Sequence, residues 1–170
     1  MPVYWAFRAL EFKHEGWNVD GFHKVLRGIA ADLGYWINEA RCVIAFTREG
    51  QPAAYAFRWY LTNEPDYKYA LKTIFVRLIM RPTMKPVPGS DPKNPKMASY
   101  GLIQINMDGV LVSDYLKLWA DSPVLSLLLG VRERYFYISF IERWKQQMQH
   151  DADQIFAKSK AYLDYLPSIS

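Results

Sequence analysis

The chain has 170 residues, a length typical of one domain or of one domain with an extension. Half of it is hydrophobic (51%) and 16% is aromatic, so a large core can form, yet there is no apolar run of about 18 residues of the kind that crosses a membrane. The single cysteine, Cys42, excludes an internal disulfide. With no secretory signal recognised, we expect a cytoplasmic protein in which Cys42 is a small buried hydrophobe.

The net charge of +4 is unevenly placed. The segment 66–98, called the basic segment below, carries seven Lys or Arg against two Asp. Such an excess is typical of a surface that meets phosphates or an acidic protein face, and also of a solvated loop kept soluble by lysines. Its basic residues are Lys68, Lys72, Arg77, Arg81, Lys85, Lys93 and Lys96.

In chain order, alternating apolar residues predict a strand at 3–12. Helical spacing then predicts a helix at 21–33, with Gly34 at its C-terminal cap. Strands follow at 41–47 and 53–61, joined by a turn at 49–52 into a hairpin.

A second helix is predicted from Glu64 to about Met80, because apolar residues recur there at spacings of three and four. The segment 82–98 holds five prolines and is predicted to be an extended loop. A strand at 100–107 follows, and Asp108-Gly109 indicates a tight turn into 110–112.

The C-terminal third is predicted to be helical. Ser113 could cap a short helix that ends near Asp121, and a further helix begins at Ser122-Pro123 and stops at Gly130. From 131 to about 166 the pattern indicates one long amphipathic helix, or two in line with a break near His150.

The order strand, helix, strand, strand, helix, strand predicts an α+β fold of the ferredoxin-like (βαββαβ) type: an antiparallel sheet with both helices on one face. We expect this core to span 1–112, with the Pro-rich basic loop at 82–98, and a helical extension at 113–170 that packs on it or projects from it. The strands at 3–12 and 53–61 would be central neighbours. The helix side would carry Val3, Trp5, Phe7, Tyr55, Phe57 and Trp59, and the open face Tyr4, Arg8, Arg58 and Tyr60.

The run Ala53–Tyr60 resembles the third strand of RNA-recognition-motif domains at Tyr55, Ala56, Phe57 and Tyr60. It departs from that family at Ala53, Ala54 and Arg58, where the family has a basic residue, a glycine and a buried aliphatic residue. The resemblance covers about eight residues. It implies that Tyr55 and Phe57 face RNA, the opposite of what the alternation of the strand predicts.

These observations favour a small intracellular protein that contacts nucleic acid or a nucleoprotein complex, through the basic segment and through the open sheet face. The expected nucleic-acid-binding residues are Lys68, Lys72, Arg81, Lys85, Lys93, Lys96, Arg8, Arg58, Tyr60 and Tyr4.

Two other outcomes stay open at this point. The C-terminal helix could cover the open sheet face, which would make Tyr4 and Tyr60 core residues. Alternatively the protein is an interaction module, such as an inhibitor, immunity or adaptor protein. It would then use that helix to bind a protein partner or a second copy of itself. The expected partner-binding residues are Tyr137, Ile141, Trp144 and Met148.

Motifs for catalysis are absent from the sequence. It contains no G-x-S-x-G, no phosphate-binding G-x-x-x-x-G-K-[ST] and no G-x-G-x-x-G. Glu142, His150 and Asp153 could share one helix face, but a metal site needs further convergent ligands. We therefore expect no cofactor and no metal, and the sequence gives no support to an enzyme.

Overall fold

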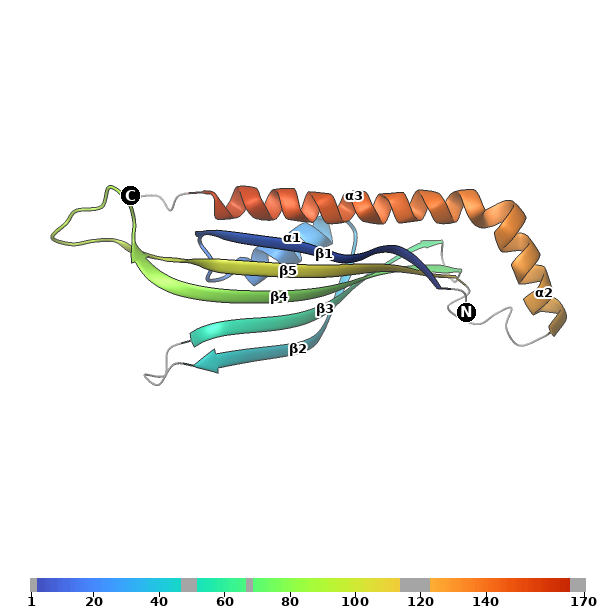
Figure 1. Cartoon of the computed structure of the whole chain (residues 1–170), viewed down its shortest axis with the longest axis horizontal. Helices are drawn as coiled ribbons and strands as arrows, with labels where there is room; N and C mark the ends of the chain where they lie inside the picture. Colours follow the sequence, from blue (N-terminus) through green and yellow to red (C-terminus); the bar gives the residue numbers. More distant parts are fainter. Residues whose placement is uncertain (1–2, 47–51, 67–68, 114–122, 166–170) are drawn as a thin grey trace.

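The computed structural model describes residues 3–46, 52–66, 69–113 and 123–165. Its strands form one antiparallel sheet in the order β1-β5-β4-β3-β2. The long helix α3 runs along one face of that sheet, and α2 leaves it at an angle beyond the sheet (Figure 1). The elements are β1 (Val3–Trp17), α1 (Phe22–Asp32), β2 (Trp36–Phe46), β3 (Pro52–Asp66), β4 (Ala70–Pro86), β5 (Met97–Ser113), α2 (Pro123–Arg132), the π-helical turn η1 (Glu133–Tyr137) and α3 (Ile138–Leu163).

The ferredoxin-like prediction is wrong. After α1 the chain forms β2, β3, β4 and β5 as successive antiparallel neighbours, and β1 closes the sheet beside β5. The segments 3–12 and 53–61 are therefore not paired, because β1 pairs with β5 while β3 lies between β2 and β4. The helix predicted at 21–33 is confirmed as α1.

The topology prediction failed because the segment 64–80 was read as a helix. From residue 70 onward it is strand β4, in which Ile74, Val76, Leu78 and Met80 are all buried on one face. The other face carries Phe75 and further apolar residues, so the sequence of this segment also matches the apolar pattern of an amphipathic helix. Threonine and β-branched residues favour the extended form here, since they pack well on a pleated surface.

The turn predicted at Asp108-Gly109 is also wrong, because β5 runs straight through it. Gly109 lies opposite Phe7 of β1. A Cβ at Gly109 would lie 2.4 Å from Cε1 of Phe7, so the glycine leaves room for a core ring instead of forming a turn. The connecting loop is 87–96, shorter than the predicted 82–98, and is closed by the Val87 N–H donating to the Lys96 carbonyl (2.8 Å).

The helical predictions are partly corrected. Helix α2 continues past Gly130, and α3 runs without a break through His150. The irregular turn is η1, at 133–137. The short helix predicted from Ser113 to about Asp121 falls almost wholly on 114–122, outside the described residues.

The core lies between α1, α3 and one face of the sheet. The odd-numbered side chains of β3 point into it, as the alternation predicts: Trp59 and Leu61 are each 1% exposed. Ile141, Met148 and others of the α3 stripe are buried against this same face. Because α1 and α3 together cover the sheet face on which Trp59 lies, the opposite face, with Arg58 and Tyr60, stays open to solvent.

The faces predicted for the start of β1 are reversed. Val3 and Trp5 are exposed, whereas the Tyr4 hydroxyl reaches Glu133 beneath the helices. The pairing of β1 with β5 shifts register between Trp5 and Phe7 and again between Phe7 and Leu10. Each shift adds one residue to β1 that has no partner on β5, and this inverts which of the following side chains face the core. Strict alternation along the whole strand therefore could not predict its faces.

Two buried carboxylates fix the helices on the sheet. Glu133 of η1 accepts hydrogen bonds from Tyr4 (2.7 Å), Tyr69 (3.1 Å) and Ser113. Asp151 of α3 accepts one from the Tyr35 hydroxyl (2.7 Å). Both carboxylates are under 10% exposed, so these donors replace the water that the groups lose.

We predict that Tyr35→Phe lowers the free energy of unfolding by about 1.5–3 kcal/mol, because it leaves the buried Asp151 carboxylate without this donor. Urea unfolding followed by circular dichroism measures the change. The matched control is Tyr60→Phe, whose hydroxyl lies on the open face and makes no hydrogen bond to the described residues. Equal effects of the two substitutions would contradict a role for the Tyr35–Asp151 bond.

Candidate functional site

The open sheet face carries a row of three arginines on three adjacent strands. Arg41 of β2 pairs with Arg58 of β3, and Arg58 pairs with Arg77 of β4. Arg77 in turn lies opposite Asn106 of β5. Directly paired residues point to the same side of a sheet and their Cβ atoms are about 4.5–5.5 Å apart. Three positive charges are therefore held side by side; we call them the arginine row.

Nothing in the described part of the chain neutralises the arginine row. The ion pairs of the described residues join other groups, and Arg41, Arg58 and Arg77 have no carboxylate within pairing distance. All three side chains are exposed. Like charges directly opposite each other destabilise a sheet, so the row is a local cost in stability that an anion would relieve.

Arg41 joins the row because β2 contains a bulge. The pairing of β2 with β3 shifts between Glu39 and Arg41. Glu39, on the inner side of the bulge, accepts a hydrogen bond from Nε1 of the buried Trp59 (3.1 Å). Arg41 then faces outward beside Arg58, whereas unbroken alternation from Glu39 would have turned it inward.

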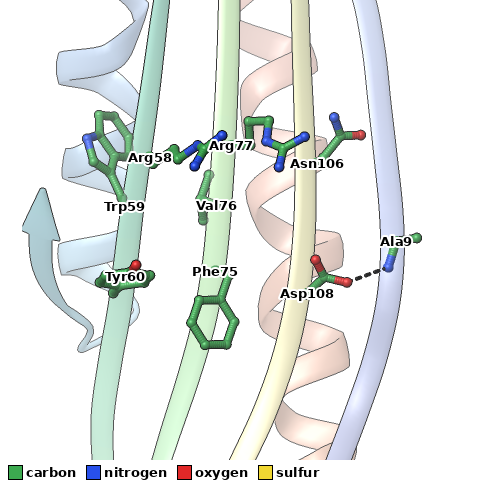
Figure 2. A pocket seen from close by; sticks show the side chains of 9 residues that line it. All are labelled: Ala9, Arg58, Trp59, Tyr60, Phe75, Val76, Arg77, Asn106 and Asp108. Carbon is green, nitrogen blue, oxygen red and sulfur yellow. Dashed lines mark hydrogen bonds between the residues drawn. The ribbon is translucent and has the colours of Figure 1, made fainter. Parts of the chain in front are cut away.

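Beside the row lies a shallow hollow of about 400 Å³ (Figure 2). Tyr60 and Phe75 form one end, with ring centroids 5.3 Å apart in an edge-to-face arrangement. Both rings are exposed to a similar degree, 40% and 39%. Arg58 and Arg77 reach across the middle of the hollow. The site therefore combines exposed aromatic rings with guanidinium groups.

The far wall of the hollow is built from a strained bulge in β1. Arg8 and Ala9 together oppose the single residue Asp108 of β5. Ala9 has a positive φ of 52°, a region that non-glycine residues seldom adopt. Its N–H donates to Oδ1 of Asp108 (2.8 Å), which stabilises this conformation. Asp108 and Asn106 thereby present polar groups to the hollow.

A second hollow, of about 260 Å³, lies on the other side of the row. Arg41, Arg58 and Arg77 line it together with Val43, Ala56 and Ile79. Because the side chain of Ala56 is small, the surface of the sheet is depressed at this position. The arginine row is thus the ridge between two depressions on the same sheet face.

Positive charge continues from the row along β4. Arg81 and Lys85 have the same parity as Arg77 and are exposed. Nζ of Lys85 lies 3.9 Å from the ring centroid of Tyr100, a cation–π contact. Arg81 and Lys85, which were predicted as binding residues of the basic segment, therefore lie on the open face of β4.

The other predicted nucleic-acid residues are not gathered at this site. Lys72 is 3% exposed on the helix side, where Nζ lies 5.5 Å from the Tyr35 ring, and burial lowers its pKa. Tyr4 is likewise on the helix side, and burial with its bond to Glu133 raises its pKa. Neither faces the arginine row.

Three further predicted residues lie outside the arginine row. Lys93 and Lys96 are exposed on or beside the loop 87–96. Arg8 is on β1, with its guanidinium carbon 4.0 Å from the Trp5 ring centroid. Lys68 is outside the described residues. The basic segment is thus split among the open face, the core and the β4–β5 loop.

The expected partner-binding residues also divide. Ile141 and Met148 are buried core residues. Tyr137 and Trp144 are partly buried and, with Phe140, Arg143 and Pro65, line a hollow of about 310 Å³. The prediction that Tyr55 and Phe57 face RNA, which the RNA-recognition-motif resemblance implies, is not supported. Phe57 is 6% exposed and stacks on His23 inside the core.

The sequence reasoning missed Arg41, Phe75, Asn106 and Asp108 as site residues. Arg77, although one of the basic residues of 66–98, was also not among the expected binding residues. Reading 70–86 as a strand would have placed Phe75, Arg77 and Arg81 on one face by period two alone. Arg41 depends on the bulge, for which the sequence carries no clear signal.

No protein-family model, curated protein or solved structure matches the chain. Among the described residues, no helix is long and apolar enough to cross a membrane. The described ranges also contain no group of three or more His, Cys, Asp and Glu side chains that could hold a metal ion.

We predict that Arg58→Gln raises the free energy of unfolding by roughly 0.2–1 kcal/mol at low salt, because it removes the central charge of three. Salt screens the repulsion between exposed charges, so the gain should shrink as ionic strength rises. Chemical unfolding at two salt concentrations measures it. Arg27→Gln, at an exposed position on α1, is the control. A loss of stability in Arg58→Gln would show that Arg58 has a structural partner.

Proposed function

We propose that this protein binds single-stranded nucleic acid, free or within a nucleoprotein complex, on the open face of its sheet. The observation that supports this most directly is the arginine row: three exposed guanidinium groups without carboxylate partners, next to two exposed aromatic rings. A sheet face that offers both kinds of group can hold phosphates and bases at once.

The phosphates would lie on the β2–β4 part of the face. Arg41, Arg58 and Arg77 supply charge there, and Arg81 continues it along β4. Guanidinium groups bind phosphate oxygens through paired N–H donors and keep their charge at any physiological pH. Binding through several such contacts releases counterions, so affinity should fall steeply with salt.

The bases would lie on one side of the arginine row, two residues further along β3 and β4, where Tyr60 and Phe75 border the larger hollow. Stacking on an aromatic side chain contributes roughly 1–3 kcal/mol per base. Asp108, at the far wall of the hollow, repels phosphates but can accept hydrogen bonds from a base edge, and the Asn106 amide can both donate and accept. The charges of the face thus favour one orientation of the bound nucleic acid, in which its phosphates lie on the arginine row and its bases lie at the aromatic rings.

Shape favours a single strand over a duplex. Five strands about 4.8 Å apart span roughly 19 Å, wider than the DNA major groove of about 12 Å. The face cannot enter that groove, and paired bases cannot stack on Tyr60 or Phe75. An unpaired strand can lie flat along the row with its bases turned toward the rings.

We predict that the triple variant Arg41→Gln, Arg58→Gln, Arg77→Gln loses at least tenfold in affinity for a short single-stranded oligonucleotide and gives a flatter salt dependence. Fluorescence anisotropy over a salt series measures both. The control variant Lys24→Gln, Arg27→Gln, Lys160→Gln removes the same charge from exposed positions on α1 and α3. Equal losses in both variants would indicate only non-specific attraction, and no binding by the wild type would refute the proposal.

A second prediction concerns stacking. Tyr60→Ala and Phe75→Ala should each weaken single-strand binding by roughly fivefold or more, since each removes a stacking surface, and should leave the salt slope unchanged. Trp36→Ala is the matched control, because Trp36 is 80% exposed on edge strand β2 and lies outside both hollows. Affinities for single-stranded and duplex oligonucleotides of the same sequence are compared; a preference for the duplex would contradict the stacking arrangement.

A further inference from the structure

The larger hollow of the open face contains a carboxylate that phosphate binding does not explain. Asp108 is partly exposed and lies on the strand next to that of Arg77. In the described part of the chain its one hydrogen bond is that from the Ala9 N–H to Oδ1 (2.8 Å), and it forms no ion pair. A negative charge here weakens the attraction of the surface for a nucleic-acid backbone. Its place in the hollow therefore indicates a ligand group that donates hydrogen bonds.

The side chains of the hollow form two parallel rows across β3, β4 and β5 (Figure 2). The first row is Tyr60, Phe75 and Asp108, which are cross-strand partners in that order. The second row is Arg58, Arg77 and Asn106, two residues away along each strand. Neighbours within a row have Cβ atoms about 4.5–5.5 Å apart, and the two rows are about 6.8 Å apart. A base in contact with the Phe75 ring therefore has Asp108 on one side and the second row on the side at right angles to it.

The bulge in β1 fixes the direction of the carboxylate. Ala9 keeps its positive φ of 52° while its N–H holds Oδ1 of Asp108. The second oxygen, Oδ2, is turned away from Ala9 and has no partner among the described residues. A carboxylate has about four acceptor positions, so about three remain for a ligand. Because the acceptor is held in place before a ligand arrives, less freedom is lost on binding.

Guanine is the base whose edges match this arrangement. Its Watson–Crick edge carries two adjacent donors, N1–H and the N2 amino group, which can both reach one carboxylate. The neighbouring edge carries two acceptors, O6 and N7, which suit a guanidinium group. Uracil and thymine offer a carboxylate one donor between two acceptors. Adenine and cytosine offer an amino group beside a ring nitrogen that the carboxylate repels.

We infer that the larger hollow selects guanine within the bound single strand, an inference that rests on the proposed function. Guanine stacks at Phe75, its N1–H and N2 amino group donate to Asp108, and its O6 and N7 accept from the second row. Arg77 belongs to both the second row and the arginine row, so it links the base to the neighbouring phosphate. The smaller hollow has no carboxylate among its described lining residues. Selection is therefore confined to one nucleotide.

The test compares oligothymidylates that differ only at one central base, by fluorescence anisotropy with the full chain. The wild type should bind the probe with guanine about tenfold more tightly than those with adenine, cytosine or thymine, as expected for a bidentate base contact. Hypoxanthine in place of guanine removes the N2 amino group, and 7-deazaguanine removes the N7 acceptor. Each of these two analogues should lose several-fold of the preference.

Asp108→Asn is the variant that isolates the carboxylate. Its Oδ1 can still accept from the Ala9 N–H, whereas an amide donor replaces Oδ2 and faces the donors of guanine. The guanine preference should disappear, and affinity for the all-thymine probe should stay equal or rise because a negative charge is removed. Asp91→Asn is the matched control, since Asp91 is exposed on the β4–β5 loop and its Oδ1 also accepts a backbone N–H, from Lys93 (2.9 Å). Thermal unfolding verifies that both variants keep the fold.

The outcomes separate this inference from the proposed function. Equal binding of all four probes by the wild type would overturn the guanine selection, as would a preference that survives in Asp108→Asn. Equal binding of adenine and guanine would overturn it too, since it would indicate stacking of purines without recognition of their edges. In each of these cases the all-thymine probe still measures single-strand binding, and the proposed function stands. A wild type that binds none of the probes would refute both.

Discussion

Burial of α3 against one face of the sheet is the interaction on which the rest of this molecule depends. The helix shields Ile74, Leu78, Ile105 and other strand residues that would otherwise face water. An antiparallel sheet can have one face packed on the core and the other in solvent, and the alternation of β3 and β4 puts arginines, together with exposed aromatic rings, on the solvent side. The arginine row exists because Trp59 and Val76 are taken into the core, which turns Arg58 and Arg77 outward.

The buried carboxylates explain why α3 settles in one position. Apolar packing alone is non-directional and tolerates displacement of a helix along its axis. Glu133 needs three hydroxyl donors and Asp151 needs Tyr35, and these come from separate elements of the sheet side. Sliding the helix would separate both acids from their donors, so the polar contacts select a single register. The open face is thereby held on a rigid support.

The sequence allowed some features to be predicted and concealed others. Alternation in 53–61 gave the correct faces of β3, and helical spacing with Gly34 located α1. The topology was not predictable in the same way, because 70–80 is apolar on both faces and fits two periods equally. The faces of β1 and the position of Arg41 depend on bulges, which are decided by packing against neighbouring strands. The candidate site was therefore seen only in part, through Arg58, Tyr60, Arg81 and Lys85.

The bulge between Glu39 and Arg41 has a second effect, at the outer edge of the sheet. Strand β2 is an edge strand and is exposed along most of its length, with Trp36 and Phe46 among its most accessible residues. A long regular edge of this kind invites another chain to add a strand. The extra residue breaks the repeat of free N–H and C=O groups halfway along β2, and charged side chains flank the break. The irregularity that completes the row of guanidinium groups thus also discourages the molecules from joining edge to edge into fibres.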